Sequence, residues 1–276
     1  MGMSAASADP IVIWGAGAIG GTIGAYFIRA GHDVLFVDQD AAHVDAINKT
    51  GLVIEGPIDQ FTVKARAATP EHVTGVYSRI LLCVKAHHTE TATKQLAPHL
   101  AADGYVASFQ NGLNELVIGD IVGPTRTIGA FLNFGADYMS PGVILFGGRG
   151  AVVLGELDGS ISPRLKALYN LMLIFDPNAI MTESIMNYLW GKLGYGALLF
   201  ATALTNASIC DALGAEDARP VLRKIAQEAT AVALALGFQP LGFNGYDPKA
   251  FTKDADRKST RLNSSHVALS RMPSSA

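Results

Sequence analysis

The chain opens with apolar runs separated by segments whose apolar residues recur at helical spacing. The runs Ile11–Trp14 and Val34–Val37 predict two strands, and 18–30 between them predicts a helix. A continuous apolar run at 80–84 is typical of a strand buried on both faces of a sheet, and a helix pattern follows at 89–97. This alternation predicts an α/β fold with a doubly wound sheet of the Rossmann type.

The remaining patterns extend this sheet and then change character. Further strands are predicted at 52–54, 61–63, 105–109, 127–133, 143–147 and 151–154, and further helices at 41–49 and 161–174. The first two of these strands are expected to form a hairpin. From Thr182 onward, long helical patterns at 183–207 and 217–236 replace the alternation. We therefore expect a Rossmann-like domain at 11–181 followed by an all-α domain at 182–255.

Residues 256–276 continue neither pattern. They show no strand or helix period, and they resemble the translation of a sequencing-adapter oligonucleotide. We therefore expect a non-native tail and a helical domain that is truncated near residue 255. The alternative is a native Ser-rich disordered tail.

Composition narrows the class of protein. The 276 residues are 49% hydrophobic and 16% charged, with a net charge of −3, which argues against a nucleic-acid partner. Cys83 and Cys210 both lie in apolar runs, as expected of free thiols in a reducing compartment. Residues 1–10 lack the pattern of a signal peptide, and Lys192 interrupts the longest apolar stretch, at 189–207. The sequence thus predicts a cytoplasmic protein without a membrane partner.

A glycine-rich turn joins the first predicted strand to the first helix. Gly15 allows the tight turn, Gly17 lets the backbone approach a pyrophosphate, and Gly20 lets the helix pack close to its strand. The helix N-terminus would present free amides to the phosphates. The alternative is a glycine turn in an ordinary βαβ unit. The predicted dinucleotide-binding residues of this turn are Gly15, Ala16, Gly17, Ala18, Ile19 and Gly20.

Asp38 ends the second predicted strand, where a dinucleotide's adenosine ribose lies in such folds. Its carboxylate would accept hydrogen bonds from the ribose hydroxyls and repel a 2′-phosphate. Neither Gln39 nor Asp40 supplies an arginine for that phosphate. The pattern therefore favours NAD over NADP, the alternative being a solvated turn aspartate.

Three further polar residues adjoin or interrupt apolar segments. Lys85 ends the 80–84 strand, and Asn111 lies in the Gln-Asn-Gly turn after the 105–109 strand. Each is either a cleft residue or an ordinary strand-end residue. Lys192 lies within an apolar helix, where burial would lower its pKa and suit it to donate a proton to an alkoxide. The alternative is a lysine whose head reaches water. No metal-ligand spacing is present.

These motifs together resemble the ketopantoate reductase family over residues 11 to about 255. They are Gly-Ala-Gly-Ala-Ile-Gly-Gly at 15–21, Val84-Lys85, Gln110-Asn111-Gly112, Gly135-Ala136 with Pro141-Gly142, Leu154-Gly155-Glu156 and Leu189-Trp190-Gly191-Lys192-Leu193. The resemblance implies an NAD(P)-binding domain followed by a helical domain that meets the substrate and is a candidate surface for a homodimer. It further implies reduction of the 2-keto group of 2-dehydropantoate, a step of pantothenate biosynthesis.

The same resemblance implies roles for particular residues. Lys192 resembles the proton donor, and Asn111 resembles the residue that touches both the nicotinamide and the substrate. Lys85 and Ala136 resemble cofactor contacts.

The sequence departs from the family pattern at three places. Gly196 and Phe200, four and eight residues after Lys192, stand where the family usually has asparagines, so the predicted substrate-facing stripe is smaller and more apolar. Asp38 stands near the position of an arginine often present in the family, whose usual cofactor is NADP. A later serine and a C-terminal glutamate of the family have no counterpart before residue 255.

The sequence therefore predicts an oxidoreductase that uses NAD, with NADP as the family alternative, to reduce a 2-keto acid. Two alternatives stay open. One is another 2-hydroxy acid or opine-like dehydrogenase on the same architecture, and the other is a truncated, non-catalytic dinucleotide-binding fragment.

Overall fold

The computed structural model describes residues 9–252, so the tail at 256–276 lies outside the described residues. The strands are β1 (Ile11–Trp14), β2 (Val34–Val37), β3 (Leu52–Glu55), β4 (Phe61–Val63), β5 (Arg66–Ala68), β6 (Tyr77–Leu82), β7 (Leu100–Ser108), β8 (Thr127–Ser140), β9 (Val143–Glu156) and β10 (Ile180–Met181). The α-helices are α1 (Ala18–Arg29), α2 (Ala41–Thr50), α3 (Thr89–Leu96), α4 (Asn114–Val122), α5 (Pro163–Phe175), α6 (Ile185–Thr202), α7 (Ile209–Gly214) and α8 (Arg219–Ala235).

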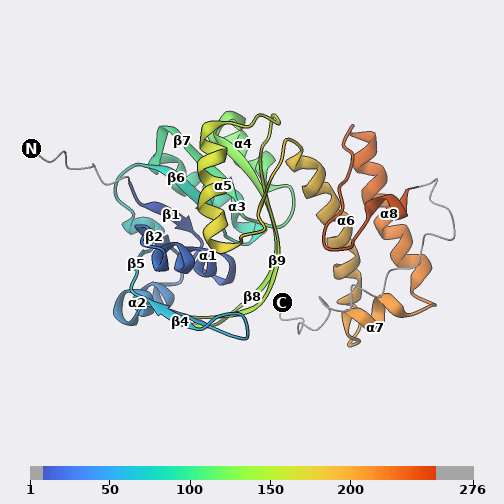
Figure 1. Cartoon of the computed structure of the whole chain (residues 1–276), viewed down its shortest axis with the longest axis horizontal. Coiled ribbons are helices and arrows are strands. Elements are labelled where there is room, and N and C mark those ends of the chain that lie inside the picture. The colour runs from blue at the N-terminus through green and yellow to red at the C-terminus, as the bar shows by residue number, and fades with distance from the viewer. Residues whose placement is uncertain (1–8, 253–276) are drawn as a thin grey trace, which may run out of the picture.

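All of these strands belong to one twisted sheet, in the order β4-β3-β9-β8-β7-β6-β1-β2-β5, with β10 beside β9. The strands from β8 through β7, β6, β1 and β2 to β5 are parallel, as expected for a Rossmann-type sheet. The long β8–β9 pair is antiparallel and curves round one side of the α/β unit (Figure 1). The predicted hairpin of β3 and β4 is confirmed.

The central strands are buried on both faces because helices cover both. Ile11 and Ile13 face a core that includes α1 and α5, whereas Val12 and Trp14 face a core that includes α3 and α4. Alternate residues of β1 thus enter opposite layers, and both sets must be apolar. This arrangement explains the apolar runs of the sequence.

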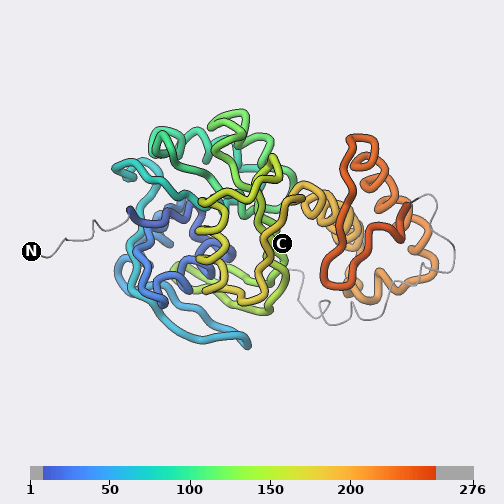
Figure 2. Tube along the Cα trace, turned by 45° about the horizontal axis from the view of Figure 1, so that its top comes forward, coloured from blue at the N-terminus to red at the C-terminus, as the bar shows by residue number. Residues whose placement is uncertain are grey.

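Helices α6, α7 and α8 lie to one side of the sheet in both overall views (Figures 1 and 2). A third core joins them to the sheet, because Phe131 of β8 and Val153 of β9 pack with Ile185 and Leu189 of α6. Gly191 lets the Leu241 carbonyl approach α6, since a Cβ there would lie 2.0 Å from that oxygen. Lys192, the next residue, therefore sits on a helix fixed from both sides.

Several predicted elements differ from the observed ones. The strands expected at 143–147 and 151–154 are one strand, β9, which glycines interrupt in sequence but not in structure. A Cβ at Gly150 would lie 1.4 Å from the Asn133 carbonyl oxygen, so the close β8–β9 pairing requires glycine there. The helix expected at 183–207 ends at Thr202, and α7 is separate. Helix α4 and strands β5 and β10 have too short or too mixed a pattern to be predicted.

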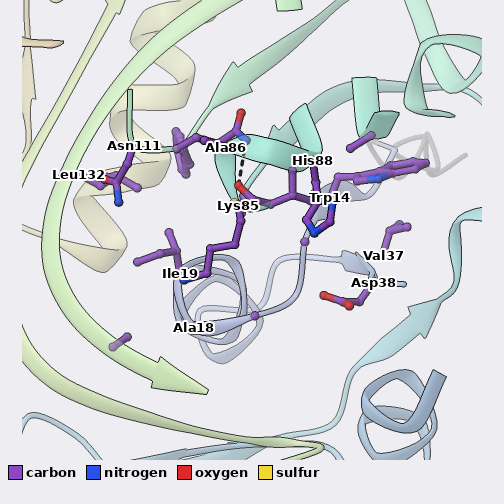
Figure 3. Close-up of a pocket in the computed structure, with 18 of the residues that line it drawn as sticks. Trp14, Ala18, Ile19, Val37, Asp38, Lys85, Ala86, His88, Asn111 and Leu132 are labelled. Atoms are coloured by element: carbon purple, nitrogen blue, oxygen red, sulfur yellow. Dashed lines mark hydrogen bonds between the residues drawn. The ribbon is translucent and has the colours of Figure 1, made fainter. Parts of the chain in front are cut away.

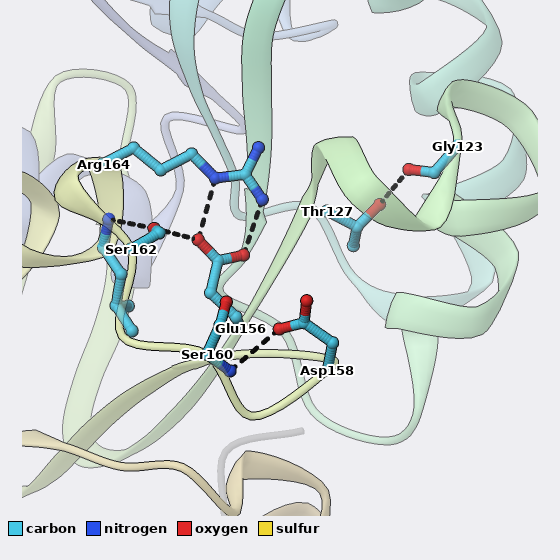
Figure 4. Close-up of polar contacts among 8 residues, drawn as sticks. Gly123, Thr127, Glu156, Asp158, Ser160, Ser162 and Arg164 are labelled. Carbon is cyan, nitrogen blue, oxygen red and sulfur yellow. Dashed lines mark hydrogen bonds and ion pairs between the residues drawn. The ribbon is translucent and has the colours of Figure 1, made fainter.

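The Leu154-Gly155-Glu156 motif forms the C-terminal end of β9 and serves the fold. There Glu156 pairs with Ile128, near the start of β8. Glu156 is buried and receives two hydrogen bonds from Arg164, of 2.8 and 2.6 Å (Figure 4). Ser162, which caps α5, donates a third to Glu156 at 2.5 Å. The carboxylate thus ties α5 to the end of β9.

Candidate active site

A cleft of about 550 Å³ lies at the carboxyl ends of β1, β6 and β7 and against the middle of β8. It brings together most of the residues that the sequence analysis singled out (Figure 3). Those lining it are Gly15, Gly17, Ala18, Ile19, Asp38, Lys85, Asn111, Ala136 and Lys192. In Figure 3, Asp38 and Asn111 lie at opposite ends of the labelled residues, with Ala18 and Ile19 between them. We call the first of these the Asp38 end. The second, where Lys192 contacts Asn111, is the Lys192 end.

The glycine-rich turn forms the floor between the two ends. Gly15 has a φ of +102°, and a Cβ there would lie 2.7 Å from the Val84 backbone nitrogen. Gly20 lets the start of α1 pack closely against the turn that follows β1, because a Cβ at Gly20 would lie 2.1 Å from the Gly15 carbonyl oxygen. Gly17 is different, because a Cβ there would meet nothing within 4 Å and would project into open space. An open backbone at the start of a helix fits a bound pyrophosphate.

At the Asp38 end, carboxylates are fixed by backbone amides. Asp38 accepts a hydrogen bond from the Ala16 amide at 2.8 Å and another from the Asp40 amide at 3.0 Å. Asp40 caps α2 through the Ala42 and His43 amides and receives the Tyr138 hydroxyl at 3.0 Å. The Asp38 end is therefore negative, and its carboxylates are held in place before any ligand arrives.

Buried His43 joins three segments at this end. Its Nε2 lies 2.9 Å from the Ala16 carbonyl oxygen, and its Nδ1 accepts the Gly142 amide at 2.9 Å. Because Nδ1 is an acceptor, Nε2 carries the ring hydrogen and donates a hydrogen bond to the Ala16 carbonyl. The glycine-rich turn, α2 and the β8–β9 hairpin are thereby linked.

At the Lys192 end, an ammonium from α6 meets the turn after β7. Lys192 Nζ donates to Asn111 Oδ1 at 2.7 Å and to the Leu132 carbonyl, and it lies 5.1 Å from the centre of the Phe131 ring. Burial lowers the pKa of Lys192 to about 8, while the charge of Glu115 acts to raise it. An amine with this pKa can donate a proton near neutral pH.

A set of buried side chains holds Asn111 in position. Gln110 donates to the Val84 carbonyl and to the Thr89 hydroxyl, each at 2.8 Å. The Thr89 hydroxyl lies 2.7 Å from the Ala86 carbonyl oxygen and 3.1 Å from Asn114 Oδ1, and Asn114 Nδ2 donates to the Asn111 carbonyl at 2.7 Å. The sequence analysis missed Thr89 and Asn114, because a threonine and an asparagine at helix starts are usually ordinary capping residues.

Glu115 is a third residue that the sequence analysis missed at this end. Its side chain is fully buried, and within residues 9–252 neither carboxylate oxygen has a hydrogen-bond partner. Burial raises the pKa of Glu115 to about 7, although its own backbone amide, Ser108 and Lys192 act to lower it. A glutamate in the first turn of a helix is common, so only its burial marks it as unusual.

Gly196 and Phe200 lie one and two turns beyond Lys192 on α6 and do not line the cleft. A Cβ at Gly196 would meet nothing within 4 Å, and Phe200 is 82% exposed. The structure places both on the open side of the helix, and their contact with a substrate stays a prediction.

Comparison with known proteins now gives the family. The family described as ketopantoate reductase PanE/ApbA matches residues 11–159. The chain belongs to the ketopantoate reductase family. A 2-dehydropantoate 2-reductase of Mesorhizobium japonicum is 30% identical over 256 residues, covering 84% of this chain and 78% of the relative. One of Pyrococcus abyssi is 35% identical over 185 residues, covering 66% of this chain and 59% of the relative.

The solved structure of D-mandelate dehydrogenase with NADH and anilino(oxo)acetate shares the fold, with a TM-score of 0.74. It is 22% identical to this chain and covers 83% of this chain and 75% of its own. Family and fold together make the chain an oxidoreductase with a nicotinamide dinucleotide cofactor. The described residues include no helix long and apolar enough to cross a membrane.

Proposed function

We propose that this ketopantoate reductase relative uses NADH to reduce a 2-keto acid to the 2-hydroxy acid, with Lys192 as the proton donor. The observation that carries the proposal is the place of the Lys192 ammonium. It lies 2.7 Å from Asn111 in the same cleft that the glycine-rich turn lines. A proton donor and a dinucleotide-binding turn in one cleft are the parts that carbonyl reduction requires.

The chain's own residues would hold the cofactor along the floor of the cleft. The turn from Gly15 to Gly20 and the free amides of α1 would bind the pyrophosphate, and Asp38 would bind the adenosine ribose. Lys85 and Ala136, which also line the cleft, would contact the rest of the dinucleotide. When bound, the nicotinamide supplies the hydride.

The Lys192 end would handle the proton and the substrate. As the 2-carbon gains a C–H bond, the electrons of the carbonyl double bond move to its oxygen, and Lys192 Nζ gives up one N–H proton to that oxygen. Asn111 would keep Nζ in position, because the Thr89, Gln110 and Asn114 hydrogen bonds fix the Asn111 backbone. Part of the expected rate enhancement therefore comes from holding the proton donor in position.

The preference for NADH follows from the Asp38 end. A 2′-phosphate there would meet the carboxylates of Asp38 and Asp40, and the amides of Ala16, Asp40, Ala42 and His43 already donate to those carboxylates. A ribose hydroxyl, in contrast, can donate to Asp38. Like charges disfavour the phosphorylated cofactor.

For the substrate, 2-dehydropantoate is the first candidate, because the curated relatives carry that activity in their names. A second candidate is a 2-keto acid with a larger apolar group. The fold shared with D-mandelate dehydrogenase, solved with NADH and anilino(oxo)acetate, favours it. In this proposal residues 11–181 bind the cofactor, whereas 182–255 complete the substrate side and offer a homodimer surface.

The test is a stoichiometric reduction with the purified chain. NADH is mixed with 2-dehydropantoate, phenylglyoxylate or pyruvate, and both NADH loss and 2-hydroxy acid formation are measured. We expect one hydroxy acid per NADH for at least one substrate. NADH binding without reduction of any 2-keto acid would instead support a dinucleotide-binding fragment that lacks catalysis.

A further inference from the structure

The buried carboxyl group of Glu115 has no role in the mechanism proposed above. Glu115 lies in the first turn of α4, four residues after Asn111, and its side chain is fully buried. Its neighbour Asn114 donates a hydrogen bond to the Asn111 carbonyl, so Glu115 belongs to the segment that positions the Lys192 contact. Within the described part of the chain, both of its carboxylate oxygens lack hydrogen-bond partners.

A carboxyl group kept only for the fold normally has partners. Glu156, for comparison, is also buried and accepts hydrogen bonds from Arg164 and Ser162. A buried carboxyl without such bonds costs stability, and groups of this kind concentrate at functional sites. Glu115 therefore differs from Glu156 in a way that points to function.

The charged partner of Glu115 is Lys192. Among residues 9–252, Lys192 on α6 is the charge that acts on Glu115, and Glu115 is the charge that acts on Lys192. The backbone amide of Glu115 and the Ser108 hydroxyl at the end of β7 favour the carboxylate more strongly than Lys192 does, but neither of them titrates. Burial disfavours both charged forms, and the charge of each group offsets part of that cost for the other.

We propose that Glu115 is a positioning residue for the proton donor, whose negative charge keeps Lys192 protonated inside the cleft. This inference rests on the proposed role of Lys192. It adds that the ammonium is maintained by the buried carboxylate of Glu115 as well as by its contacts with Asn111 and Leu132. Deprotonation of Lys192 at lower pH is the expected consequence of removing that charge.

The direct test measures the protonation of Lys192 without turnover. Acetic anhydride acylates the neutral amine, so the labelling rate of Lys192, followed by mass spectrometry from pH 6 to 10, reports its pKa. We expect a midpoint near pH 8 in the wild-type chain and a lower midpoint in Glu115→Gln. Asp120→Asn is the matched control, because it removes one carboxylate from an exposed position of the same helix. An unchanged midpoint in Glu115→Gln, or an equal shift in both variants, would overturn the proposal.

Turnover gives a second readout that a structural role would not produce. At pH 6 Glu115 is largely protonated and resembles glutamine, so the variant should match the wild type. At pH 8 the variant should be slower, by about fivefold if the Lys192 pKa falls by one unit, because half of the wild-type lysine is then still protonated. An equal loss at both pH values would mean a structural role. A labelling shift in a chain that reduces no 2-keto acid would leave the coupling intact and reject only the proposed function.

A second variant keeps the proposal testable if Glu115→Gln does not fold. Lys192→Met removes the other charge, so ionising Glu115 should then cost more stability. The melting temperature of Lys192→Met, relative to the wild type, should fall further at pH 8 than at pH 6. A difference that does not change with pH would contradict the coupling.

Discussion

The two ends of the cleft are built in opposite ways. At the Asp38 end the carboxylates are held by several hydrogen bonds, most of them from backbone amides within the β1–α1–β2–α2 segment. At the Lys192 end the ammonium reaches Asn111 from a helix 81 residues away in sequence, and buried Glu115 has no hydrogen bond among the described residues.

The difference separates binding from chemistry. Polar groups with satisfied hydrogen bonds form a rigid surface that recognises a ligand and changes little with pH. Buried charges without such bonds are costly, but their pKa values move toward neutrality, where proton transfer is useful. On this account the Asp38 end selects the cofactor and the Lys192 end moves the proton. Changes at one end should leave the function of the other largely intact.

The largest effect is expected from Lys192→Ala. Loss of the proton donor should lower turnover by roughly 10²–10⁴-fold, while the dissociation constant for NADH stays close to the wild-type value. Lys192→Arg should restore little, because a guanidinium keeps its proton at any working pH. The check is steady-state reduction beside fluorescence titration of NADH. Near-normal turnover in Lys192→Ala would make Lys85, the other lysine in the cleft lining, the next candidate.

A methyl group at Gly17 should weaken NADH binding, which Lys192→Ala is expected to leave unchanged. Gly17→Ala places a Cβ in open space, so it creates no clash within the protein, but the Cβ would occupy the path of the pyrophosphate. An overpacked contact costs about 1–3 kcal/mol, which would weaken NADH binding by roughly 5- to 150-fold. Gly196→Ala is the control, because its Cβ also meets nothing within 4 Å but lies outside the cleft lining. Equal NADH affinities in the two variants would contradict the assigned path.

Charge reversal at Asp38 should have a smaller and selective effect. Asp38→Arg should raise the ratio of NADPH to NADH affinity by roughly tenfold, equivalent to about 1.4 kcal/mol. It should also weaken the binding of NADH, because the Ala16 and Asp40 amides lose their acceptor. Asp45→Arg makes the same charge change at an exposed position of α2. Both cofactors are titrated at fixed salt, because screening alters such ratios. Tighter NADPH than NADH binding in the wild type would reject the NADH preference.

The same contrast explains what could be predicted from the sequence. The glycine-rich turn and Asp38 fall within one strand–helix–strand unit, so residue spacing alone locates them. Lys192 stood out because it interrupts an apolar helix, but its contact with Asn111 depends on how α6 packs against β8 and β9. Glu115 could not be singled out, because sequence gives no measure of burial for a glutamate in the first turn of a helix. The β8–β9 pair was also underestimated, since its glycines break the apolar pattern that reveals strands.

The central claim, that Lys192 is the proton donor, is tested most directly by a single-turnover measurement. The chain is saturated with NADH at each pH from 6 to 10 and mixed with its best 2-keto acid, and one round of reduction is followed. Because only the ammonium form can give a proton, the rate should be constant at low pH and fall as pH rises through about 8. The decline should approach roughly tenfold per pH unit, since the ammonium fraction falls in that proportion. A rate that stays flat to pH 10, or that rises with pH, would contradict the account.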